Sequence, residues 1–165
     1  MLSLKRLIFL LLVIAAVTYV VTTSAGLPPS VAARFGHQGL WIGRMDKDVH
    51  VALMVGLAGG LPLLLYGSIG VLPRLFTRFI NIPNRDFWLA PERREKMLGD
   101  LEHHGMMLGI FSMVFICAMQ ALIVAANQRT PARIDINLVW VLLGFFIAGI
   151  IGMAVTMWLR FRRLG

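Results

Sequence analysis

The chain has 165 residues, of which 58% are hydrophobic, and its mean hydropathy is +0.79. This composition excludes a soluble globular protein, because too few polar residues remain to cover the surface. The net charge of +8 would favour nucleic-acid binding in a soluble chain. Here the basic residues stand between uncharged stretches, as topology signals and anionic-lipid contacts do, so no nucleic-acid partner is expected.

Four stretches without Asp, Glu, Lys or Arg occupy most of the chain. About 20 mostly apolar residues cross the hydrocarbon core as a helix, since each residue adds about 1.5 Å of rise. We therefore expect an all-α fold, an integral membrane four-helix bundle that makes residues 1–165 a single four-span domain. The predicted spans are about 7–26, 49–73, 103–127 and 136–160.

The distribution of basic residues predicts the orientation of the bundle. With the N and C termini both cytoplasmic, the inner segments hold 11 of the 16 Lys and Arg residues, and the outer segments hold 5. This excess on the inner side follows the positive-inside rule.

The first span could also be part of a signal peptide. Lys5 and Arg6 precede the apolar run, and Thr23, Ser24 and Ala25 form a possible small-residue cleavage site. The apolar run continues to Val21 and is longer than a usual signal-peptide core, which favours a retained membrane anchor.

The outer segment, about residues 26–48, is apolar for a loop. We expect it to lie against the membrane surface or to cap the bundle, with Trp41 at the interface. The second span follows from about Asp48 or Val49. Its Gly56-x-x-x-Gly60 pattern and Pro62 predict close helix contact and a kink.

A metal site is one hypothesis for the segment that contains Asp46, Asp48 and His50. If these residues were helical, Asp46 and His50 would lie one turn apart, and His37 could add a ligand. The alternative is structural: Asp48 caps the second span and His50 lies at the interface. We favour the structural alternative and predict no metal and no other cofactor.

The inner loop combines aromatic and charged residues. It either pins spans two and three in place or docks a partner, and its candidate interaction residues are Arg85, Asp86, Trp88, Arg93 and Arg94. Pro91 followed by Glu92 is typical of a helix start. No residue interrupts the pattern from there, so helix three is predicted to begin before the membrane.

Small residues recur at four-residue spacing in the last two spans. Span three contains Gly105 and Gly109, and span four contains Gly144, Ala148 and Gly152. Such stripes let helix backbones approach closely. The stripe in span four could serve either the intramolecular bundle or an interface with a partner.

No constellation of catalytic residues is present in the spans. They contain no charged residue away from their ends, and Gln120 is the only amide deep in a span. The single cysteine, Cys117, lies in mid-span, where a packing role is expected. We therefore predict that the protein is not an enzyme. A small transporter or channel subunit for a neutral solute, lined by Ser112, Gln120 and Thr156, is the alternative function.

Two loop segments resemble a known family. They are residues 27–47, with Leu27, Pro28, Val31, Arg34, Phe35, Gly39 and Trp41, and Ile82-Pro83-Asn84-Arg85-Asp86-Phe87-Trp88-Leu89-Ala90-Pro91-Glu92-Arg93-Arg94. Both are similar to a bacterial membrane family of unknown function, the "domain of unknown function" family numbered 1648, related to the SdpI immunity-protein family. The resemblance covers roughly residues 10–125. The chain departs from the family pattern at Arg34, where His is usual, and at Trp41, which comes early.

The resemblance implies a multi-span bundle with a non-catalytic role in the bacterial inner (cytoplasmic) membrane. We expect an interaction or regulatory module, either an immunity-type factor or an accessory subunit of a larger membrane complex. Its expected partners are the lipid bilayer and other membrane protein subunits. The predicted interaction residues are Arg34, Trp41, Arg85, Asp86, Trp88, Arg93, Arg94, Gly144, Ala148 and Gly152.

Overall fold

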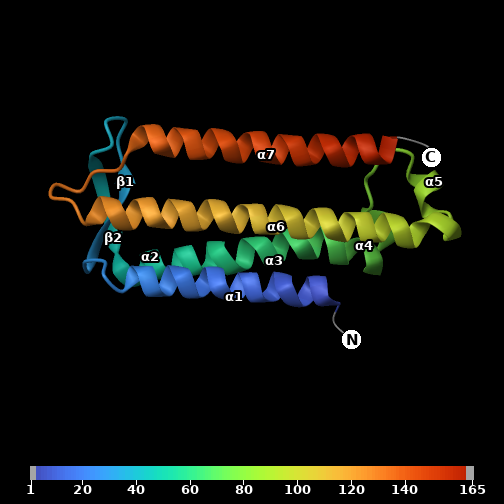
Figure 1. Cartoon of the computed structure of the whole chain (residues 1–165), viewed down its shortest axis with the longest axis horizontal. Helices are drawn as coiled ribbons and strands as arrows, with labels where there is room; N and C mark the ends of the chain where they lie inside the picture. Colours follow the sequence, from blue (N-terminus) through green and yellow to red (C-terminus); the bar gives the residue numbers. More distant parts are fainter. Residues whose placement is uncertain (1–2, 163–165) are drawn as a thin grey trace.

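A computed structural model describes residues 3–162 as long helices lying side by side, with a small β-hairpin across one end (Figure 1). Three long elements are α1 (Leu4–Ser24), α6 (Pro91–Asn127) and α7 (Ile136–Arg162). The fourth is a composite helix made of α2 (Lys47–Val55), η1 (Gly56–Gly60), α3 (Leu61–Tyr66), η2 (Gly67–Val71) and α4 (Leu72–Leu75). The shorter elements are β1 (Ser30–Phe35), β2 (Trp41–Asp46), η3 (Thr77–Phe79) and α5 (Arg85–Leu89).

Within the described residues, four helical segments are long and apolar enough to cross a membrane. They are Leu4–Ser24, Lys47–Leu75, Pro91–Asn127 and Ile136–Arg162, and each contains most of one predicted span. Helix α6 begins at Pro91, well before its apolar stretch, as the Pro-Glu start predicts. The hairpin and the α6–α7 loop form one end of the bundle, called here the hairpin end. The start of α1, the end of α7 and α5 form the other, called the loop end (Figure 1).

The all-α expectation is wrong in one respect, because the predicted outer segment folds into an antiparallel hairpin of β1 and β2. Its residues Val31 and Ala32 are buried, so part of the apolar character of this segment serves to cover the end of the helices. The side chain of Asn127 at the end of α6 fixes the hairpin, since its amide accepts from the Ala32 N–H at 2.8 Å and donates to the Ala32 carbonyl at 2.9 Å.

The composite helix contains two π-helical turns, and each ends just before a Leu-Pro pair. The turn Gly56–Gly60 precedes Pro62, and Gly67–Val71 precedes Pro73. Proline lacks an N–H and crowds the carbonyl four residues earlier, so the backbone widens locally to keep its hydrogen bonds. A π turn therefore stands directly before Pro62, the residue for which the sequence predicts a kink. Close contact at Gly56 and Gly60 is wrong, because both glycines face open space and Gly59 instead meets Val17.

Helices α1 and α6 and the composite helix pack into a three-helix core. Its centre is apolar and buried: Phe9, Val13, Ala16, Val20, Met54, Ala58, Met106, Met113 and Ile116. Close approach depends on the small residues of α6, since a Cβ at Gly109 would lie 2.9 Å from the Phe9 ring. Gly105 likewise lies against the backbone of Gly70, so the predicted packing role of the Gly105–Gly109 stripe is confirmed.

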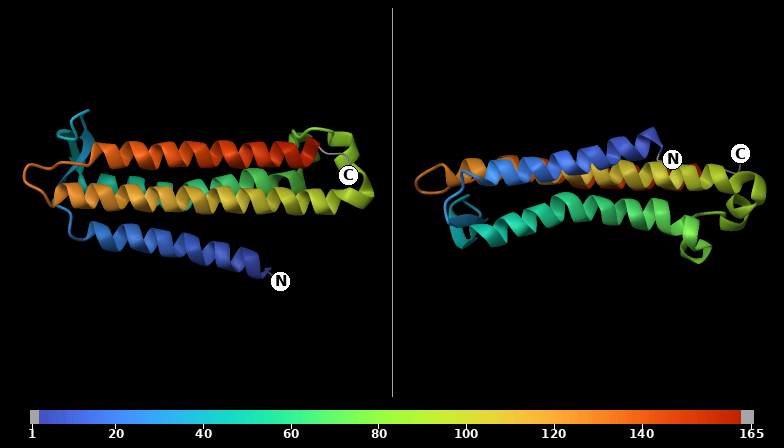
Figure 2. Two further views of the ribbon diagram at one scale, coloured as in Figure 1. Left: turned by 45° about the horizontal axis from the view of Figure 1, so that its top comes forward. Right: turned by 90° about the horizontal axis from the view of Figure 1, so that it is seen from below.

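Helix α7 lies outside this core, on the far side of α6 from α1 (Figures 1 and 2). None of the 18 residues in its most apolar part is buried. It contacts α6 through stacked rings, with the Phe115 and Phe146 centroids 4.2 Å apart. A second contact is made where Phe111 covers Gly149 so closely that no Cβ fits there. The fold is thus a three-helix core with a peripheral fourth helix.

This packing predicts different effects for two glycines of the same helix. Replacement Gly149→Leu should lower the free energy of unfolding by about 1–3 kcal/mol, because the new side chain must displace the Phe111 ring. Gly144→Leu should leave it unchanged or slightly raised, because its Cβ meets open space and leucine favours helix. Thermal or denaturant unfolding followed by circular dichroism in detergent measures both, and equal stability of the two variants would contradict the α6–α7 contact.

Candidate functional site

Two polar clusters lie at opposite ends of the α6 face that points into the three-helix core. One is built around Glu102 at the loop end and the other around Gln120 at the hairpin end. The two residues are 18 positions apart, which corresponds to about 27 Å along the helix. Apolar residues separate the clusters, so each has its own chemistry.

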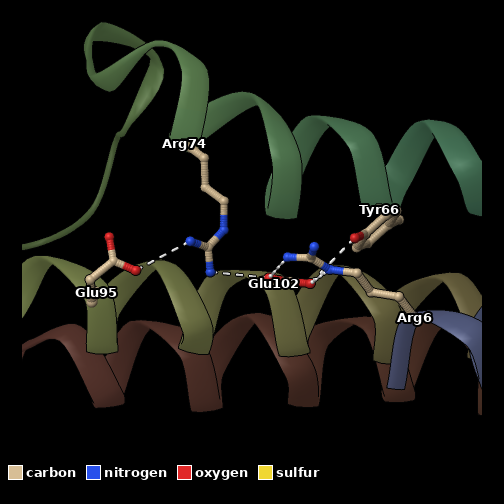
Figure 3. A network of polar contacts seen from close by, with 5 residues as sticks. All are labelled: Arg6, Tyr66, Arg74, Glu95 and Glu102. Carbon is tan, nitrogen blue, oxygen red and sulfur yellow. Dashed lines mark hydrogen bonds and ion pairs between the residues drawn. The ribbon is translucent and has the colours of Figure 1, made fainter. Parts of the chain in front are cut away.

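The Glu102 cluster joins α1, α3, α4 and α6 (Figure 3). The Arg6 guanidinium donates twice to the Glu102 carboxylate, at 2.6 Å from Nε and 3.0 Å from Nη2. Arg74 donates from Nη2 at 3.1 Å, and the Tyr66 hydroxyl donates at 3.3 Å. Arg74 also reaches outward to Glu95 at 3.3 Å. Two arginines and two carboxylates therefore balance in charge.

The electrostatic strength of this cluster comes from the shielding of Glu102, whose side chain is 12% exposed, whereas that of Glu95 is 80% exposed. A bidentate, charge-assisted pair in a shielded position is much stronger than an exposed ion pair. Glu102 is thus the hub that holds α1 and the end of the composite helix against α6.

The second cluster is built on His50, Gln120 and Ser24, all buried. The Gln120 amide nitrogen donates to the Ser24 hydroxyl at 2.9 Å, so the amide oxygen faces His50 Nε2 at 3.1 Å. His50 must therefore carry its proton on Nε2 and donate it to Gln120. This cluster joins α1, α2 and α6 at the hairpin end. The His50 side chain is only 1% exposed, so it is buried inside the bundle and is not available on its surface.

The four candidate metal ligands do not come together. His50 is committed to Gln120, and Asp46 caps α2 by accepting from the Asp48 N–H at 2.8 Å. The cap is thus Asp46 and not Asp48 as expected, while His37 lies apart at the hairpin tip. Residues 3–162 contain no group of three or more His, Cys, Asp or Glu placed to hold a metal ion.

The aromatic motif of the inner loop binds the end of α7. Trp88 is 5% exposed, and its Nε1–H donates to the Phe161 carbonyl at 2.9 Å. Asn84, in the left-handed backbone region at φ 54°, donates to the Arg162 carbonyl at 3.0 Å. Carbonyls in the last turn of a helix have no partner within the helix, so these side chains cap α7. The inner loop, which is expected to fix spans two and three, therefore also holds span four.

The remaining charged residues of that motif lie on the surface. Arg85 donates to the Thr77 carbonyl at 3.3 Å, and the Arg93 guanidinium stacks on the Phe87 ring at 4.0 Å. Asp86 and Arg94 are exposed. The motif thus has a structural side, which holds α7, and a charged outer side that is open to a partner.

At the hairpin end, Trp41 and Arg34 are also exposed. Trp41 lies under the Arg44 guanidinium, which is 4.6 Å from the ring centroid. Arg34 packs its aliphatic portion beside Gly43 on the neighbouring strand. Both side chains are thus on the surface of the hairpin, whereas Val31 and Ala32 are buried.

The small-residue stripe of α7 faces away from the rest of the molecule. Apart from the adjacent residues and the backbone of α7 itself, no atom lies within 4 Å of the Cβ position of Gly144 or Gly152, and Ala148 between them is exposed. An intramolecular packing role for this stripe is therefore wrong.

The residues of the alternative transport function do not share one channel. Ser112 and Gln120 are buried in the three-helix core, where the Ser112 hydroxyl donates to the Gly109 carbonyl. Thr156 lies on the exposed surface of α7, and its hydroxyl donates to the Met153 carbonyl within its own helix.

No protein-family model matches this chain, and neither the curated proteins nor the solved structures contain a match.

Sequence reasoning missed the Glu102 hub, Asn84 and the burial of His50. Arg6 and Glu102 are 96 residues apart, and His50 and Gln120 are 70 apart. One signal was available: a glutamate directly before an apolar span requires a partner if it is shielded from water.

The hub makes a testable prediction about two glutamates. Glu102→Gln should lower the free energy of unfolding by about 1–3 kcal/mol, because Arg6 and Arg74 then face a neutral amide. Glu95→Gln removes the same charge from an exposed position and should cost less than about 1 kcal/mol. Unfolding of both variants in the same detergent measures the difference, and similar losses would show that Glu102 is not the hub.

The second cluster gives a separate prediction. Gln120→Leu keeps most of the side-chain volume but leaves the His50 N–H and the Ser24 hydroxyl without this partner. We expect a loss of about 1–2 kcal/mol in the free energy of unfolding. Thr156→Val, which removes a hydroxyl bonded only within α7, is the control and should have little effect. A Gln120→Leu variant as stable as the control would rule out a stabilising role for this cluster.

Proposed function

We propose that this chain is a non-enzymatic, multi-span protein of the bacterial inner membrane that acts as an interaction module. Its partner is another membrane protein, and one helix of that partner packs on the outward face of α7. In this role the chain is an accessory subunit of a larger membrane complex or an immunity-type factor. Both termini are cytoplasmic in this proposal, as the distribution of basic residues favours.

The observation that carries the proposal is the position of the small-residue stripe on α7. Phe146 contacts α6 and precedes Ala148 by two residues, which is about 200° around the helix. Ala148 and the two glycines, at four-residue spacing, therefore lie on the face nearly opposite to α6. The stripe of small residues is open, and nothing in the described chain covers it; larger exposed apolar side chains such as Val141, Ile151 and Val155 flank it.

A smooth stripe has a specific physical use in a membrane. Apolar helices gain no hydrophobic free energy by leaving lipid, so association depends on close packing, which small residues permit. Gly149 shows the same principle inside the molecule, since its missing side chain lets Phe111 approach. Gly144 and Gly152 offer similar access on the opposite face.

The hydrogen bonds that cap both ends of α7 also support a docking role. Trp88 and Asn84 hold its last carbonyls, and Asp135 caps its first turn by accepting from the Asn137 and Leu138 N–H groups at 3.1 Å. A helix fixed at both ends offers a preorganised surface, which lowers the entropic cost of binding.

The accessory-subunit role and the immunity-type role are supported by different observations. The accessory-subunit role is supported by the open face of α7, and the immunity-type role by the resemblance of the two loop segments. A transport function has less support, because a channel would require several chains and the predicted lining residues Ser112 and Gln120 are buried.

The experiment is purification of tagged protein from its own membranes in mild detergent, followed by native mass spectrometry. The wild type should retain a membrane partner in a fixed ratio. The variant Gly144→Leu/Gly152→Leu should lose it, with dissociation constants raised on the order of tenfold or more, because two leucines hold the helices apart.

The matched control is Gly60→Leu, a glycine that also faces open space but lies on the composite helix. It should keep the partner, and all variants should elute as folded protein with unchanged helix content. A wild type without a partner, or a control that loses the partner equally, would count against the α7 interface.

A further inference from the structure

A polar hollow lies at the hairpin end, between the tip of the hairpin and the α6–α7 loop. Its volume is about 310 Å³, and its polar lining comes from Gln38, Arg129, Arg133, Asp135 and Asn137. None of these residues belongs to the α7 face or to the two polar clusters described above.

The walls of the hollow are fixed by backbone hydrogen bonds. The Ile134 N–H donates to the Gly39 carbonyl at 2.9 Å, and Leu40 forms an isolated bridge with Arg133. Gly39 adopts φ 75°, and the Ile134 carbonyl occupies the place that a side chain would need. The Arg133 N–H donates back to the Ala126 carbonyl at 3.3 Å, which ties the loop to α6. The hollow is therefore preformed.

The two arginines of the hollow have no side-chain partner among residues 3–162. Two other cations of the same end are engaged: Arg44 stacks on Trp41, and Lys47 donates to the Ala25 carbonyl at 2.9 Å. Arg129 and Arg133 are both exposed, and no ion pair or hydrogen bond of their guanidinium groups is present in the described chain.

The acidic residue in the lining, Asp135, offsets only one of the two arginine charges. Oδ1 of Asp135 accepts from the Asn137 and Leu138 N–H groups, both at 3.1 Å, and so caps α7. The helix N-terminus is thus already occupied and is not the binding element. The polar lining of the hollow is a pair of guanidinium groups, the side-chain amides of Gln38 and Asn137, and the Asp135 carboxylate, so a net positive charge remains.

This set of donors is suited to a tetrahedral oxyanion. A guanidinium presents a planar fork of N–H groups that matches two oxygens of a phosphate, and amide NH₂ groups can donate to the others. The hollow lies between the end of α6 at Asn127 and the start of α7 at Ile136. With the helices crossing the bilayer as proposed above, it lies at the depth of the lipid phosphates.

We infer that this hollow binds a phosphate group through Arg129 and Arg133, with Gln38 and Asn137 as neutral donors. The phosphate belongs to a lipid headgroup of the adjacent leaflet or to free phosphate, since both present the same oxygens. The inference rests on the proposed membrane placement but not on the partner interface of α7.

The test uses the full-length protein in a phosphate-free, uncharged detergent. Short-chain phosphatidylglycerol is added in one arm and counted by native mass spectrometry. Inorganic phosphate alone is added in the other, and its ³¹P line width is measured. The wild type should bind one phosphatidylglycerol, and Arg129→Gln/Arg133→Gln should weaken this binding by about tenfold or more, since two charge-assisted contacts are lost.

The matched control is Arg34→Gln/Arg44→Gln, which removes the same charge from the same end but outside the hollow. It should keep the wild-type affinity within about threefold, as expected for distant, screened charges. Binding in both arms that the hollow variant loses indicates a general phosphate site, and binding in the lipid arm alone indicates a headgroup site.

Equal binding by the wild type and the hollow variant would overturn the inference, and so would an equal loss in the control. The purification experiment on α7 separates this result from the proposed function. A hollow variant that loses phosphatidylglycerol but keeps the partner supports both ideas independently, whereas a chain that binds lipid without any partner contradicts only the α7 interface.

Discussion

The contact on which the architecture depends is the shielded carboxylate of Glu102, which accepts from Arg6, Tyr66 and Arg74 at one end of the three-helix core. Apolar helices in lipid have little driving force to choose one arrangement, so a polar hub with few acceptable partners selects it. The buried cluster of His50, Gln120 and Ser24 does the same at the other end. Between the two, Gly105 and Gly109 allow the backbones to approach closely.

Helix α7 is held mainly by aromatic contacts and end caps, whereas the three-helix core is held by two polar clusters. The stability of the core is therefore largely independent of the outer face of α7. Among residues 3–162 this helix has no polar contact with the core in mid-helix. It is held by Phe111, Phe115 and Phe146 and by the caps at its ends, and near its C-terminus by the buried Phe161 and the Arg160–Asp100 ion pair at 2.9 Å. The three-helix core does not depend on the outer face of α7, the face proposed for a partner. A fold divided in this way suits an interaction module, because the binding surface can change without loss of the bundle.

The hairpin end shows how a loop acquires a fixed shape at the end of a helix bundle. Asn127 pairs with both backbone groups of Ala32, and the backbone of Gly39 pairs with Ile134, so the hairpin and the α6–α7 loop brace each other. Residues far apart in the chain thereby enclose one polar hollow. Its arginines have no side-chain partner among residues 3–162, and this is the physical basis for the proposal of an anionic ligand.

The sequence by itself determined the four apolar helices and the early start of α6, because bilayer thickness and helix-start chemistry are local properties of the chain. It also placed the close-packing role of Gly105 and Gly109. Only the tertiary structure decided that Glu102 is a hub, that His50 is buried and that the outer segment is a hairpin. These features depend on partners such as Arg6 and Gln120, up to 96 residues away. The direction of the Gly144–Gly152 face was decided in the same way, since spacing defines a stripe on a helix but packing decides what that stripe meets.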